Sequence, residues 1–138
     1  MPKRMINPSP LPQPDGYSHA IGVTGGELIF LAAQDATDEN GAIVAPGDIV
    51  IQYEQVLRNL FVVMKEAGGV MQDIVKMNIY LTDARKYTDN FEALREVHQA
   101  YFEDYAPAIA LLEVKSLYRR EALVVCDGIA VIEPEEKD

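Results

Sequence analysis

The feature that most constrains the fold of this chain is a change of hydrophobic period at Gly68-Gly69. Before this pair, apolar residues recur every three or four positions over residues 50–67, which is typical of one face of an amphipathic helix. After it, residues 73–82 alternate as a half-buried strand does. Asp48 is suited to cap the helix and the glycine pair to end it. The sequence therefore predicts a helix followed closely by a strand.

A second unit of the same kind follows. Apolar residues recur at helical spacing from Tyr87 to Tyr105, and Pro107 is expected to end that helix. Residues 109–115 and 122–132 are then predicted to be strands. Because a strand–helix–strand unit favours a right-handed crossover, both helices are expected on one face of a sheet.

Two short apolar runs, residues 20–24 and 28–33, precede the first helix. The Gly25-Gly26 pair between them predicts a β-hairpin. The predicted order of elements is therefore β-β-α-β-α-β-β.

The second face of the predicted sheet is also largely apolar. Alternation assigns to the helix side Ala110, Leu112, Val114, Val124, Cys126, Gly128 and Ala130. It assigns to the opposite side Ile109, Leu111, Glu113, Val125, Asp127, Ile129 and Val131. A monomer would expose that opposite side, so we expect self-association through the sheet.

The ends of the chain differ from the middle. Residues 1–15 are rich in proline, which predicts an extended N-terminal arm. Residues 16–132 are expected to form a single domain, and residues 133–138 an acidic tail that frays.

Composition excludes several classes of function. Twelve Lys and Arg against 22 Asp and Glu give a net charge of −10, which opposes phosphate backbones, so a nucleic-acid partner is not expected. No apolar run approaches the roughly 20 residues that a membrane span needs, and no signal-peptide pattern opens the chain. We therefore expect a soluble cytoplasmic protein with no membrane partner. The lone Cys126 excludes an internal disulfide, and no His/Cys cluster has the spacing of a metal site.

Three strings together resemble the RidA/YjgF/UK114 family: DIVKMNIYLTD, the PA-x-A-L-L-E-V strand and the final GIAVI. The resemblance covers about residues 16–132. It implies an α+β, chorismate-mutase-like fold and a homotrimer whose sheets form a central barrel, with small-molecule pockets at the subunit interfaces. It also implies cofactor-free hydrolysis of reactive enamines and imines, such as 2-aminoacrylate, to 2-keto acids and ammonia.

The chain differs from this family at the positions that bind the substrate and catalyse its hydrolysis. The family's Arg, which follows Pro-Ala and binds the substrate carboxylate in bidentate fashion, is replaced by Ile109. The resemblance aligns the family's last-strand Glu with Val125, a pocket Gly with Ala33, and a pocket Asn with Arg95. Because Ile cannot make charge-assisted hydrogen bonds, we expect 2-aminoacrylate deamination to be weak or absent.

The remaining candidate residues each allow two interpretations. Tyr17 either walls the pocket, as its match in the family does, or anchors the arm. Glu113 and Asp127 match family carboxylates and would form an acid/base pair if their strands pair; otherwise both are simply solvated in the barrel. Arg95 either compensates for the lost Arg or makes a routine surface pair with Glu92.

Four further side chains can be interpreted from the sequence. Phe91 joins the expected substrate-binding set, which is Tyr17, Ala33, Phe91, Arg95, Ile109 and Val125. His19 is either a general base or a residue that hydrogen-bonds to a neighbouring chain. His98 is expected to pack against other side chains or to face solvent. Cys126 is expected to be a buried apolar side chain and not a nucleophile.

Two functions remain open at this point. The first is a RidA-like hydrolase with a remodelled, more apolar pocket, in which Glu113, Asp127 or Tyr17 handles protons. The second is a non-catalytic ligand-binding or interaction trimer on the same scaffold, so the sequence does not decide whether the chain is an enzyme. Ribonuclease activity, attached to some family members, is disfavoured by the excess of acidic residues.

Overall fold

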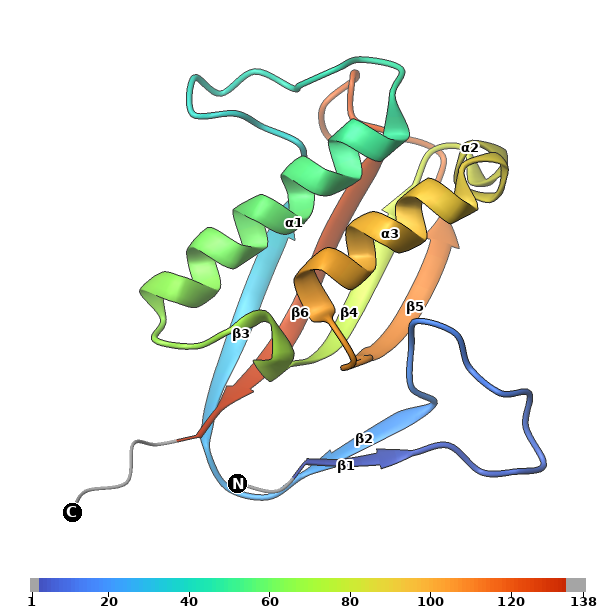
Figure 1. Cartoon of the computed structure of the whole chain (residues 1–138). Helices are drawn as coiled ribbons and strands as arrows, with labels where there is room; N and C mark the ends of the chain where they lie inside the picture. The colour runs from blue at the N-terminus through green and yellow to red at the C-terminus, as the bar shows by residue number, and fades with distance from the viewer. Residues whose placement is uncertain (1–2, 134–138) are drawn as a thin grey trace.

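The computed structural model describes residues 3–133 and contains a four-stranded sheet in the order β3-β6-β4-β5. These strands are β3 (Glu27–Gln34), β6 (Val124–Ile132), β4 (Ile74–Leu81) and β5 (Ala108–Glu113). β4 and β5 are parallel, and the other neighbours are antiparallel. Helices α1 (Ile49–Glu66) and α3 (Phe91–Phe102) cover one face of the sheet (Figure 1). The α+β architecture with its helices on one face is as predicted.

Helix α1 begins and ends where the sequence predicts. The Asp48 carboxylate accepts hydrogen bonds from the backbone N–H groups of Val50 and Ile51, both at 3.1 Å. These bonds satisfy N–H groups that have no partner within the helix. At the other end Gly68 adopts a φ of +86°, a conformation that favours glycine, and stops the helix. A short 3-10 turn, η1 (Met71–Asp73), then leads into β4.

The core lies between the helices and the covered face of the sheet. Its fully buried side chains include Tyr53, Val56, Leu57, Leu60, Met64, Met77, Ile79, Leu81, Leu94, Phe102 and Cys126. Cys126 is thus a buried apolar side chain, as predicted, and burial raises the pKa of its thiol. A protonated, inaccessible thiol cannot act as a nucleophile.

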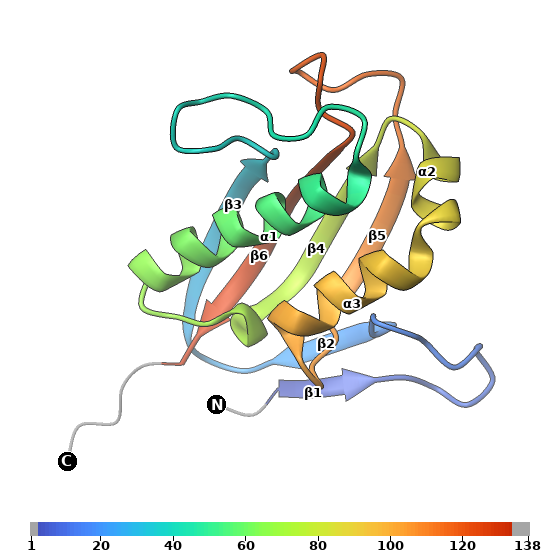
Figure 2. The ribbon, with the colours of Figure 1, turned by 45° about the horizontal axis from the view of Figure 1, so that its top comes forward.

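The predicted hairpin before the first helix is wrong. Strand β2 (Ala20–Val23) pairs with β1 (Lys3–Ile6) in a separate two-stranded sheet, whereas β3 pairs with β6. Figure 2 shows the β1–β2 sheet beside one end of the main sheet, near the end of α3. Gly25 and Gly26 have positive φ angles, so they turn the chain from one sheet into the other. A glycine pair permits either path, and only long-range pairing decides between them.

The predicted second helix is divided in two. Helix α2 (Ala84–Asp89) is capped by Asp83, but it stops at Asn90, where α3 begins in a new direction (Figure 1). Helix α3 ends at Phe102 and not at Pro107, because Glu103 adopts a φ of +57°. Residues 103–107 then carry the chain from the end of α3 to β5 at the edge of the sheet.

The assignment of faces is right for β6 and wrong for β5. Ile109 and Leu111 lie opposite Met77 and Ile79 of β4, which are buried under the helices. Paired residues share a face, so Ile109, Leu111 and Glu113 point to the helix side and Leu112 to the open side. Both faces of β5 are apolar, and a period of two does not say which is covered.

The open face of the sheet carries exposed apolar side chains. Phe30 is 73% exposed, and Leu28 and Leu112 are about half exposed. This agrees with the expectation of a second apolar face. Within residues 3–133 no helix is long and apolar enough to cross a membrane.

Strand packing at Gly128 provides a test of the sheet. A Cβ at this position would lie 2.3 Å from the carbonyl oxygen of Lys76, which is backbone and cannot move freely. We expect Gly128→Ala to lower the free energy of unfolding by about 1–3 kcal/mol, measured by urea unfolding. The control is Gly22→Ala in β2, whose Cβ would meet the Arg4 side chain at an ordinary 3.7 Å. Equal stability of the two variants would contradict the packing described here.

Candidate functional site

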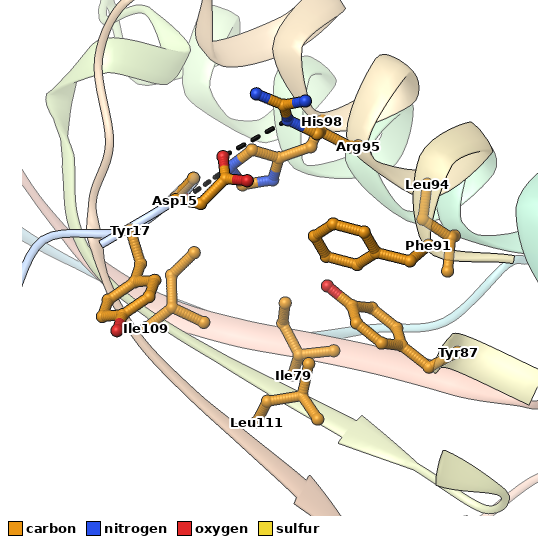
Figure 3. Close-up of a pocket in the computed structure, with 11 residues that line it drawn as sticks. Asp15, Tyr17, Ile79, Tyr87, Phe91, Leu94, Arg95, His98, Ile109 and Leu111 are labelled. Carbon is orange, nitrogen blue, oxygen red and sulfur yellow. Dashed lines mark hydrogen bonds and ion pairs between the residues drawn. The ribbon is translucent and has the colours of Figure 1, made fainter. Parts of the chain in front are cut away.

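A pocket of about 280 Å³ lies on the helix side of β5. It is lined by Asp15, Gly16, Tyr17, Ile79, Tyr87, Phe91, Leu94, Arg95, His98, Ile109 and Leu111. These residues come from the segment before β2, from helices α2 and α3, and from strands β4 and β5 (Figure 3). The pocket therefore joins segments that are far apart in the sequence.

Most of the pocket is apolar. Ile79, Ile109 and Leu111 rise from the sheet, and the rings of Tyr87 and Phe91 come from the helices (Figure 3). These two rings meet edge to face, with centroids 6.3 Å apart. Burial raises the pKa of Tyr87, with smaller contributions from Cys126 and Asp15, so its hydroxyl stays protonated at neutral pH. This part of the pocket suits the apolar body of a small molecule.

A buried histidine holds the opposite wall. The Tyr53 hydroxyl lies 2.9 Å from Nδ1 of His98, and Nε2 of His98 lies 3.0 Å from the Gly16 carbonyl oxygen. Because a carbonyl only accepts, we assign the proton to Nε2, and Nδ1 accepts from Tyr53. Burial lowers the pKa of His98, although the bond to Gly16 and the charge of Asp15 act in the other direction. His98 is thus a neutral link between α1, α3 and the arm, and it is not solvent-facing.

Backbone contacts fix Tyr17 beside β5. The neighbouring Ser18 donates its N–H to the Pro107 carbonyl at 2.9 Å and its hydroxyl to the Ala106 carbonyl at 2.6 Å. The Tyr17 ring also meets His19 edge to face. Tyr17 therefore lines the pocket and forms part of the arm's packing, so its two interpretations are compatible. The His19 ring bonds to the Pro12 carbonyl at 2.9 Å and lies outside the pocket lining.

One ion pair lies at the polar end of the pocket. Nε of Arg95 is 3.3 Å from a carboxylate oxygen of Asp15, with the two side chains 42% and 54% exposed. Figure 3 shows this pair away from the Tyr87 end of the pocket. The partner of Arg95 is thus an acid of the arm and not Glu92 on its own helix. An ion pair this exposed contributes only about 0–1 kcal/mol.

The two candidate carboxylates of the last strands do not meet. Strand β4 lies between β5 and β6, so the condition for an acid/base pair of Glu113 with Asp127, that their strands pair, is not met. Glu113 accepts the backbone N–H of Ala84 at the start of α2, at 2.9 Å. Asp127 lies on the open face and accepts from Asn78 at 2.8 Å and from the Tyr80 hydroxyl at 3.3 Å.

The sequence found part of this pocket. Four of the expected residues line it, namely Tyr17, Phe91, Arg95 and Ile109. Ala33 lies exposed on β3, and Val125 lies on the open face of β6, so neither joins it within one chain. Asp15, Tyr87, His98 and Leu111 were missed. No local pattern signals them, because the pocket forms only when the arm meets the helices.

Comparisons with known proteins identify the family. The family model described as Endoribonuclease L-PSP matches residues 10–132. A RutC family protein of Pyrococcus abyssi is 34% identical over 131 residues, which are 94% of this chain and 98% of that protein. The chain belongs to the RidA/YjgF family. Another relative, a 2-iminobutanoate/2-iminopropanoate deaminase of Dermatophagoides farinae, is 32% identical over 96% of this chain and 98% of its own length.

Solved structures of the RidA/YjgF family share the fold. A Rid family protein of Yersinia pestis, called YyfB and of unknown function, superimposes with a TM-score of 0.86 at 30% identity. The match covers 96% of this chain and all of that chain. The resemblance inferred from three short strings therefore extends to the whole domain.

The buried His98 makes stability depend on pH. Its pKa is near 6.5 in the unfolded chain and lower in the fold, so below about pH 6.5 the unfolded state binds more protons. We expect the free energy of unfolding to be highest above this pH and to fall as pH drops towards the folded pKa. In His98→Gln this part of the fall is lost, so the variant has a shallower slope between about pH 7 and pH 5 in urea unfolding. A wild-type slope in His98→Gln would refute the assignment.

Proposed function

We propose that this chain is a cofactor-free hydrolase of the imine and enamine type that takes a more apolar substrate than 2-aminoacrylate. The supporting observation is Ile109, an apolar residue on the pocket floor between Tyr17 and Leu111. In the family this position carries the Arg that binds the substrate carboxylate. Some relatives of this chain are named imine deaminases, which supports the reaction class.

The reaction adds water across a C=N bond, and ammonia leaves as the carbonyl forms. A proton must reach the departing nitrogen, and one must leave the attacking water. Tyr17 and Tyr87 both line the pocket, and Figure 3 shows the Tyr87 hydroxyl directed into it. We propose that the Tyr87 hydroxyl orients the substrate nitrogen or the water, whereas the Tyr17 hydroxyl points away from the other lining residues and its ring serves as a wall (Figure 3). Glu113 and Asp127 lie outside this pocket, so we do not carry them forward as its acid and base.

We also propose that the pocket is completed at a subunit interface in a homotrimer. Phe30, Leu28 and Leu112 expose apolar surface on the open face of the sheet, and β5 forms its edge next to the pocket. A second copy covering that face would remove these side chains from water.

The alternative is a ligand-binding trimer without catalysis. The observation that favours it is the position of the two family-matched carboxylates, both outside the pocket. Binding of a hydrophobic carbonyl compound without turnover would select this alternative.

The test is an assay of 2-keto acid release from imines generated in situ. We expect acceleration over the spontaneous rate with imines made from leucine or phenylalanine by an amino-acid oxidase. We expect little with 2-aminoacrylate made from serine by a dehydratase. Strong activity on 2-aminoacrylate would contradict the proposal, and no acceleration with any imine would refute catalysis.

A substitution at the pocket floor tests the role of Ile109. Ile109→Arg places a guanidinium at the family position and is expected to raise 2-aminoacrylate hydrolysis at least about tenfold, because Arg supplies charge-assisted hydrogen bonds. Ile109→Met is the control, since it adds length without charge. If circular dichroism shows that both variants are folded, equal rates of 2-aminoacrylate hydrolysis would count against this pocket as the catalytic site.

The assembly is tested by light scattering. We expect the wild-type mass to be three times that of the chain, and Phe30→Asp to shift the protein towards the monomer because it places a charge in the interface. Phe61→Asp, on the exposed side of α1, is the control and is expected to leave the mass unchanged. A monomeric wild type would overturn the proposed assembly.

A further inference from the structure

The Arg95–Asp15 pair is the only ion pair in which the described residues of the pocket lining take part. Asp15 reaches Arg95 through Nε, and within residues 3–133 the guanidinium has no other hydrogen-bond or ion-pair partner. Both side chains are partly exposed, so neither charge is locked in place. The pocket thus holds a carboxylate on a guanidinium at its polar end, and that carboxylate belongs to the chain itself.

Two features hold Asp15 at this position. The next residue, Gly16, accepts the hydrogen bond from Nε2 of His98 at 3.0 Å, and Ser18 bonds to the backbone at Ala106 and Pro107. These bonds fix the backbone on either side of Tyr17, and none of them involves the Asp15 side chain. Asp15 can therefore leave Arg95 without breaking the arm's attachment to the domain.

We propose that Arg95 is the anion-binding residue of this pocket and that Asp15 is its internal competitor. A ligand with an apolar, aromatic or branched body and one carboxylate displaces Asp15 and binds Arg95 in bidentate fashion. Its body packs against the rings of Tyr87 and Phe91. This inference rests on the proposed function only in taking this pocket as the ligand site.

The physical reason is a difference between the two carboxylates. The exposed Asp15–Arg95 pair is weak, because solvent screens it and a single Nε contact uses one donor of the fork. A ligand carboxylate can use two parallel donors, and the ligand gains further from the burial of its apolar body. Asp15 thereby excludes small acids, which have too little apolar surface to compete.

The test is calorimetric titration of the full-length protein with 3-phenylpropanoate and with its neutral amide. These probes have the same shape and differ in charge, and neither can be hydrolysed as an imine. We expect the acid to bind more tightly than the amide in the wild type. We expect Asp15→Asn to tighten acid binding by about two- to fivefold, the value of an exposed ion pair, and to leave the amide unchanged.

Substitution of Arg95 is expected to weaken binding of the acid, whereas Asp15→Asn tightens it. Arg95→Gln is expected to weaken acid binding about tenfold, and Arg95→Lys to give an intermediate loss, because Lys keeps the charge without the fork. The control is Arg58→Gln on α1, which removes an arginine paired with Glu54 at 3.0 Å outside this pocket. It is expected to bind both probes as the wild type does.

The outcomes separate this inference from the proposed function. Equal affinity for acid and amide, or no tightening in Asp15→Asn, would overturn the role of the pair even if imines are hydrolysed. Binding of the acid that depends on Arg95, without turnover of any imine, would support the inference and refute the hydrolase.

Discussion

The helices bury one face of the four-stranded sheet and leave the other face open, and the other features of the molecule follow from this asymmetry. α1 and α3 cover the side that carries Met77, Ile79 and Cys126, and these side chains are removed from water. The other side leaves Phe30 largely exposed. Because removal of apolar surface from water is the main favourable term in folding, one side makes the chain fold and the other side favours association.

The pocket exists because this helical layer extends over the edge strand β5. The break at Asn90 lets Tyr87 of α2 and Phe91 of α3 line the same pocket as Ile109 and Leu111, and the arm closes the remaining side. The neutral imidazole of His98 connects that arm to the core through Gly16 and Tyr53. A change in the arm's position would therefore alter the pocket.

The chemistry of the pocket differs from the family pattern in where its positive charge lies. The strand position at which the family resemblance implies an Arg is Ile109 here, while a guanidinium reaches the pocket from α3 as Arg95. The direction from which a guanidinium approaches would set how the proposed carboxylate ligand lies against the Tyr87 hydroxyl (Figure 3). The shared fold therefore does not imply a shared substrate, since function depends on the site that the fold carries.

The sequence by itself determined the local elements and the family. The caps at Asp48 and Asp83 and the stop at Gly68 are encoded within a few residues, because they depend on hydrogen bonds and backbone angles of near neighbours. Tertiary structure alone decided three things: the pairing of β2 with β1, the covered face of β5, and the order that separates Glu113 from Asp127. It also brought Asp15 to Arg95 and Gly16 to His98. These contacts join distant segments, and an apolar strand that can bury either face gives no local signal of its partner.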